Sequence, residues 1–103
     1  MDSVQKRFQV YKKSCFEYGF LALCYLIDKF AETEDYEECG LIKSVIEEIN
    51  KELKSDMPSS YDEEAFKYYQ TSYTILGNKS VETIKEESER HSNKILERIK
   101  RIK

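Results

Sequence analysis

His91 is the only histidine of the 103-residue chain, so any imidazole chemistry falls on this one position. A histidine can serve as a metal ligand, a general base or a pH-sensitive group near neutral pH. Glu87 lies four residues earlier and would share its helix face. The Glu-x-x-His motif of di-iron proteins is absent, because position 88 is a serine and there is no second histidine. We therefore interpret His91 as a helix-interface residue that is bonded to a neighbour or to water.

The three thiols, Cys15, Cys24 and Cys39, do not form a recognisable reactive or metal-binding pattern. An odd count without a Cys-x-x-Cys pair argues against a disulfide framework, and structural zinc sites use closely spaced pairs. Cys15 and Cys24 are nine residues apart, which places them on opposite sides of one helix. We expect buried, reduced thiols that bind no metal and attack no substrate.

Paired carboxylates recur along the chain, but their spacing does not suit catalysis. Adjacent residues of a helix point about 100° apart, whereas glycoside hydrolysis needs two carboxyl groups that face each other with separated pKa values. The three glycines are isolated and form no phosphate-binding loop. The sequence therefore predicts a protein that is not an enzyme and that has no catalytic residue, metal or cofactor. The pairs are Glu37/Glu38, Glu47/Glu48, Glu63/Glu64 and Glu86/Glu87.

Charge is sorted along the chain. Residues 1–27 have a net charge of +2, residues 28–64 a net charge of −9 and residues 65–103 a net charge of +4. The favoured interpretation is that the acidic middle attracts the basic ends within the fold. The alternative is that the cations bind phosphates of a nucleic acid. The candidate phosphate contacts are Lys12, Lys13, Lys94, Arg98 and Arg101.

Tyrosine is frequent, with eight residues in the chain. Tyrosine combines a large apolar area with a polar tip and is enriched at protein interfaces. Two interpretations stay open, a half-buried core with hydroxyls at the surface or a surface that binds a partner. The candidate partner surface consists of Tyr11, Tyr18, Tyr68, Tyr69 and Tyr73.

The elements that carry these residues are predicted to be helices. The first helix should run from about Ser3 to Phe30, because Val4, Tyr11, Tyr18 and Tyr25 recur every seven residues. From Phe16 to Ile27 the helix is apolar almost all round, so its second half should be the centre of the core. Gly19 lies inside this helix and predicts a kink or a close helix crossing there.

Two further helices follow. One should run from about Tyr36 to Lys54, with Asp35 and Glu38 as a reciprocal cap. The next should run from about Tyr61 to Leu76, with a capping box of Ser60 and Glu63. Gly77-Asn78 would end it, since both residues accept a left-handed conformation.

The last predicted helix begins after Ser80 and continues to near the C-terminus. Its apolar stripe spans roughly 80°, which is closer to a coiled-coil seam than to the wider face of a globular helix. Two polar residues midway would set the register of a homodimer. The predicted self-association seam is Val81, Ile84, Ser88, His91, Ile95, Ile99 and Ile102.

Taken together, the sequence predicts a single all-α domain over residues 1–103, a compact bundle of about four helices with a buried first helix and a long C-terminal helix. A helix that spans a membrane needs about 20 apolar residues. The longest apolar run here, Phe20 to Ile27, is far shorter. The first ten residues lack the apolar core of a secretion signal, so we expect a cytoplasmic protein.

The predicted function is that of a non-catalytic protein–protein interaction module, such as an inhibitor, an immunity-type protein, an adaptor or an assembly subunit. It would bind a protein partner, and we expect it to self-associate through the seam of the last helix. The alternative is a nucleic-acid-associated helical protein that uses the basic segments at the two ends of the chain.

Overall fold

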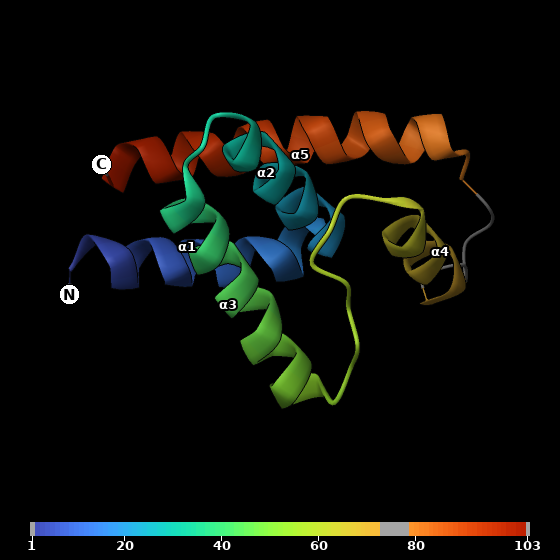
Figure 1. Ribbon diagram of the computed structural model, residues 1–103, viewed down its shortest axis with the longest axis horizontal. Helices are drawn as coiled ribbons and strands as arrows, with labels where there is room; N and C mark the ends of the chain where they lie inside the picture. Colours follow the sequence, from blue (N-terminus) through green and yellow to red (C-terminus); the bar gives the residue numbers. More distant parts are fainter. Residues whose placement is uncertain (1, 73–78, 103) are drawn as a thin grey trace.

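The computed structural model describes residues 2–72 and 79–102, and these residues form five α-helices and no strand (Figure 1). The predicted all-α class is confirmed, although the described residues form five helices instead of about four. The helices are α1 (Ser3–Tyr18), α2 (Phe20–Glu32), α3 (Tyr36–Leu53), α4 (Glu63–Ser72) and α5 (Val81–Ile102).

Helices α1 and α5 lie side by side and run in opposite directions, so the start of α1 and the end of α5 are at the same end of the molecule (Figure 1). Helix α2 packs against α1, α3, α4 and α5, and α3 also packs against α1. This arrangement gives α5 two neighbours along its length, and it places the basic parts of α1 and α5 next to each other.

Helix α2 is the centre of the core, as the sequence predicted. Seven of its first eight residues are at most 7% exposed, and Tyr25 is the exception. Burial of each large aliphatic or aromatic side chain contributes about 1.5–3 kcal/mol. The all-round apolar character of this segment therefore follows from neighbours on every side of the helix.

The first predicted helix is interrupted, because Gly19 breaks it into α1 and α2. Gly19 has φ 97° and ψ 161°, a backbone conformation that is open almost only to glycine. A continuous helix from Ser3 to Phe30 would be about 42 Å long, which exceeds the 40 Å long axis of the molecule. The break allows both halves to bury their apolar sides in one core.

The N-terminus of α4 is capped by a different residue from the one predicted. Ser60 and Glu63 were expected to form a capping box, but Asp62 Oδ1 accepts the backbone N–H of Ala65 at 3.1 Å. The helix therefore begins two residues later than the sequence suggested. Its predicted end falls within residues 73–78, which lie outside the described residues. The predicted cap of α5 is confirmed, because Ser80 Oγ accepts a backbone N–H at 3.2 Å.

A buried polar cluster joins α1 to α3. Asp35 caps α3 by accepting the Glu38 N–H at 3.4 Å, as predicted. The Glu38 carboxylate does not form the reciprocal half of that cap. It lies inside the protein, where it pairs with Arg7 and accepts the Tyr11 hydroxyl at 2.6 Å. Because a buried charge is costly without a partner, these contacts fix the position of α1 on α3.

The acidic middle of the chain also attracts the N-terminal segment at the surface. Lys12 Nζ lies 2.8 Å from Glu48 Oε2 and 2.7 Å from Glu52 Oε1, so α1 and α3 are joined by a second set of charges. These contacts support the interpretation that part of the charge sorting serves the fold itself.

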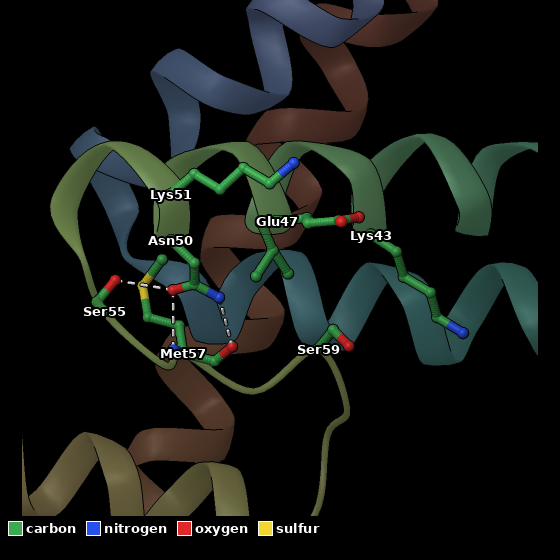
Figure 2. A pocket seen from close by; sticks show the side chains of 8 residues that line it. Lys43, Glu47, Asn50, Lys51, Ser55, Met57 and Ser59 are labelled. Carbon is green, nitrogen blue, oxygen red and sulfur yellow. Dashed lines mark hydrogen bonds between the residues drawn. The ribbon is translucent and has the colours of Figure 1, made fainter.

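The connection after α3 is held in place by Asn50. The Asn50 side chain donates to Met57 O at 3.0 Å and accepts the Met57 N–H at 2.9 Å, and it also accepts the Ser55 hydroxyl at 2.8 Å (Figure 2). Pro58 O accepts the Cys24 thiol at 3.3 Å. One helix side chain and one core thiol thus bind the connection to the body of the protein.

Candidate functional site

The centre of the predicted self-association seam belongs to the core of the single chain. Ile84, Ser88, Ile95 and Ile99 are at most 3% exposed, and α5 packs there against α1 and α2. Their assignment to a dimer seam is therefore corrected, because a second chain could reach them only if the core opened. The remaining three, Val81, His91 and Ile102, are exposed or half-buried.

The predicted tyrosine surface is mostly a packing layer. Tyr11 is fully buried, so it cannot contact a partner. Tyr68 and Tyr69 are half-buried, and their ring centroids lie 5.4 Å and 6.5 Å from that of Phe20. Tyr18 is half-buried between α1 and α5. The fifth member, Tyr73, lies outside the described residues.

The five predicted phosphate contacts divide into two groups. Lys12 is paired with α3, and the guanidinium of Arg98 lies 2.7 Å from Glu17 Oε2. Hydrogen bonds with Glu48 and Glu52 raise the pKa of Lys12, and the hydrogen bond with Glu17 raises that of Arg98. The other three, Lys13, Lys94 and Arg101, are exposed and form no ion pair with another described residue.

A groove between α1 and α5 gathers part of this basic set. It has a volume of about 280 Å³, and we call it the α1/α5 groove. Val10 and Lys13 are three residues apart on α1 and so share one edge of it. Arg98, Arg101 and Ile102 line the other edge on α5. The lining contains three cations and two aliphatic side chains but no carboxylate, so it suits a ligand that is both acidic and apolar.

Arg98 is held in a defined position at this groove. Its guanidinium donates to Ser14 Oγ at 3.2 Å, to the Tyr18 hydroxyl at 3.2 Å and to Glu17 at 2.7 Å. The guanidinium carbon lies 5.2 Å from the centroid of the Tyr18 ring. An arginine oriented in this way loses less side-chain freedom when it binds a carboxylate.

A second, smaller pocket is lined by Tyr18, whose hydroxyl accepts a hydrogen bond from Arg98 of the groove. The Tyr18 and His91 rings stack with centroids 5.0 Å apart, and Lys79 pairs with Glu87 at 3.0 Å on the rim. The volume is about 150 Å³, and we call it the His91 pocket. Thus the two pockets are lined by two of the predicted tyrosines, Tyr18 and Tyr69, by two partly exposed seam residues and by three of the predicted cations. The apolar floor consists of Leu21, Ala22 and Ile84.

His91 should make stability depend on pH. Burial lowers the pKa of His91, the cations Arg90, Lys94 and Lys79 add to this effect, and Glu87 opposes it. Since the unfolded chain then binds the proton more readily, stability should fall as the pH drops through the ordinary value of 6.5 and level off once the folded state is also protonated. Urea midpoints at about pH 7.5 and about pH 5.5 measure this difference.

The matched control for this pH effect is His91→Phe, which keeps a ring against Tyr18 but cannot titrate. Its urea midpoint should be nearly constant over the same range, because the chain has no other histidine. A midpoint that rises on acidification in the wild type, or a pH dependence that persists in His91→Phe, would contradict the assignment.

The thiols are not placed for chemistry. Burial raises the pKa of Cys15 to about 11 and that of Cys24 to about 12, and the Cys39 thiol donates to Ile27 O at 3.2 Å. The thiolate is the reactive form, so these groups are poor nucleophiles at neutral pH. Within residues 2–72 and 79–102, no group of three histidine, cysteine or acidic side chains could hold a metal ion.

A hollow between α3 and the connection after it is less selective than the α1/α5 groove. It has a volume of about 450 Å³. Its cations, Lys43 and Lys51, end apart from one another, and Glu47 lies between them on the helix (Figure 2). Asn50 is already bonded to the connection. The mixed charges therefore favour neither an anion nor a cation, and this hollow is not the candidate site.

Sequence reasoning found Lys13, Arg98 and Arg101 but missed Val10 as the apolar part of the groove. The signal was present, because Val10 precedes Lys13 by three residues and so lies on the same edge of α1.

No helix of the described residues is long and apolar enough to cross a membrane. Comparisons of the chain with protein-family models, with curated proteins and with solved structures found no match.

Proposed function

We propose that this protein is a non-catalytic binding module that takes an acidic, partly apolar segment of a protein partner in the α1/α5 groove. The observation that carries the proposal is the gathering of Lys13, Arg98 and Arg101 around Val10 and Ile102. Inhibitors, immunity-type proteins, adaptors and assembly subunits all act through surfaces of this kind.

The contact between Arg98 and Glu17 supports this proposal, because a partner carboxylate could be held in the same way. Glu17 lies on α1 outside the lining of the groove, and Ser14 and Tyr18 orient the guanidinium that binds it. Lys13 and Arg101 form no ion pair with a carboxylate of the described residues. A partner with two or more acidic residues would therefore meet cations that are still available, and its apolar side chains would contact Val10 and Ile102.

Nucleic acid is the second candidate and fits less well. Affinity for nucleic acid grows with the number of phosphates that are neutralised, and here three cations share the groove with two aliphatic side chains. The chain as a whole is acidic, with a net charge of −3, so the surface beyond the groove would repel a long polyanion. A short acidic peptide needs only the groove.

The test uses fluorescence anisotropy with three labelled probes of about 16 residues, which as a helix span about 24 Å. One probe is an acidic amphipathic peptide of glutamate and leucine, the second replaces each glutamate with glutamine, and the third is a single-stranded oligothymidine. We expect the acidic peptide to bind the wild type. The double variant Lys13→Glu/Arg101→Glu should weaken binding about tenfold or more, because two attractive charges become repulsive.

The control variant Lys51→Glu/Lys100→Glu changes the net charge by the same amount at exposed positions outside the lining of the groove. It should change the affinity less than about twofold, because charges outside the groove are screened from the bound peptide by water and salt. Equal losses in both double variants, or no binding of the acidic peptide, would refute the proposal. Binding of the oligothymidine alone, with a steep salt dependence, would favour nucleic acid.

A further inference from the structure

We infer that α1 can be exchanged between two copies of this chain, with Gly19 as the hinge, so that each copy binds the α1 of the other on its own α3 and α5. The inference is independent of the proposed function. It also supplies a route to self-association that leaves the buried residues of α5 in place.

The first support is the continuity of the helix pattern across the hinge. Apolar residues recur every seven positions from Val4 through Tyr18 to Tyr25, so the sequence on both sides of Gly19 fits one helix. Gly19 is the single residue between α1 and α2, and its N–H still donates to Cys15 O at 2.8 Å. A change of two backbone angles at this residue would join the two helices and swing α1 away from the body.

The second support is that the contacts of α1 can form equally well within one chain or between two chains. Arg7 pairs with Glu38, and Lys12 pairs with Glu48 and Glu52, all on α3. On the other side, Glu17 pairs with Arg98 of α5. A second copy offers the same charges in the same register. Exchange would therefore keep this interface and alter only the hinge, as in other domain-swapped dimers.

The third support is the backbone of the hinge itself. Gly19 lies at φ 97°, where an alanine is strained, yet nothing lies within 4 Å of a Cβ added there. The only penalty for Gly19→Ala in the closed form is therefore the backbone conformation. Joining α1 and α2 into one helix removes that penalty, and alanine is also the better helix former. Gly19→Ala should shift the equilibrium between the closed and the extended hinge by about 30-fold toward the extended form. Because a dimer contains two hinges, its dissociation constant should fall by about 1,000-fold.

The experiment begins with light scattering after size-exclusion chromatography on the full chain. Gly19→Ala should be a dimer at concentrations where the wild type is a monomer. The matched control is Gly40→Ala, because Gly40 lies within α3 and its added Cβ also meets nothing within 4 Å. Gly40→Ala should keep the wild-type mass. A folded, monomeric Gly19→Ala would overturn the inference.

A mixing experiment distinguishes exchange of α1 from a simple surface contact. One copy carries Lys12→Glu, and the other carries Glu48→Lys/Glu52→Lys. Each copy alone places like charges between α1 and α3, but an exchanged heterodimer restores opposite charges at both of its interfaces. The two copies, in the Gly19→Ala background, are refolded together and analysed by native mass spectrometry.

Random pairing of equal amounts of the two copies would give a heterodimer fraction of about one half. If α1 is exchanged, the heterodimer fraction should clearly exceed this value. A heterodimer fraction at the random value would show that α1 is not exchanged, even if dimers form. If Gly19→Ala does not fold, the same two charge variants with Gly19 retained are refolded together at high concentration. Heterodimer in excess supports the inference, and its absence overturns it.

Discussion

Replacing Arg7 with methionine should destabilise the fold by about 3–5 kcal/mol, because the Glu38 carboxylate then stays buried without its cation. Arg7 is 7% exposed and Glu38 is 1% exposed, so little water reaches the pair. Tyr11 still donates its hydroxyl at 2.6 Å but carries no charge. Urea unfolding followed by circular dichroism should show a large fall of the midpoint with an unchanged slope.

The control for this prediction is Lys6→Met, which removes one cation from the exposed neighbour of Arg7. It should change the free energy of unfolding by no more than about 0.5 kcal/mol. The triple variant Arg7→Met/Glu38→Leu/Tyr11→Phe should regain most of the loss, because no buried charge remains unpaired. A wild-type midpoint for Arg7→Met would show that Glu38 does not depend on this pair.

Replacing Ile95 with aspartate should unfold the chain. Ile95 is 0% exposed, and a buried, unpaired carboxylate is among the substitutions that cost more than about 4–5 kcal/mol. That loss is close to the whole stability of a small domain. Circular dichroism should show loss of the helical signal at room temperature, and size-exclusion chromatography should show an expanded chain.

The control on the same helix is Asn93→Asp, an exposed position that gains the same charge. It should stay folded with a wild-type mass. The Ile95→Asp result also separates two arrangements of α5. A folded Ile95→Asp monomer derived from a dimeric wild type would mean that this stripe faces a second chain and not the core.

The sequence was a good guide to helices whose pattern and neighbours agree. The burial of α2 could be predicted because its apolar residues occur on all sides. Gly19 was harder, because the seven-residue spacing continues through it and only the packing of both halves requires a turn. Arg7 gave an unused signal, since it lies within the apolar stripe of α1, where a charge predicts a buried partner.

The groove could be predicted only in pieces. Lys13 and Arg101 were identified as cations, and Ile102 was identified as part of an apolar stripe. Their meeting depends on the antiparallel arrangement of α1 and α5, which no local pattern specifies. The stripe of α5 was misassigned for a related reason. A sequence shows that one face of a helix must be covered, but it does not show whether the cover belongs to the same chain.

The clamp made by Asn50 has a consequence for how freely the chain can be altered. The Asn50 side chain forms hydrogen bonds with the backbone N–H and C=O of Met57 and not with its side chain. Every residue except proline offers the same two backbone groups. The path of the connection is therefore encoded in the helix and not in the exposed side chains of the connection, such as Asp56 and Ser60. The exposed Ser60 lies beyond this contact and before the packed ring of Tyr61, so it is a natural place to graft a foreign peptide for display, with its length as the main constraint.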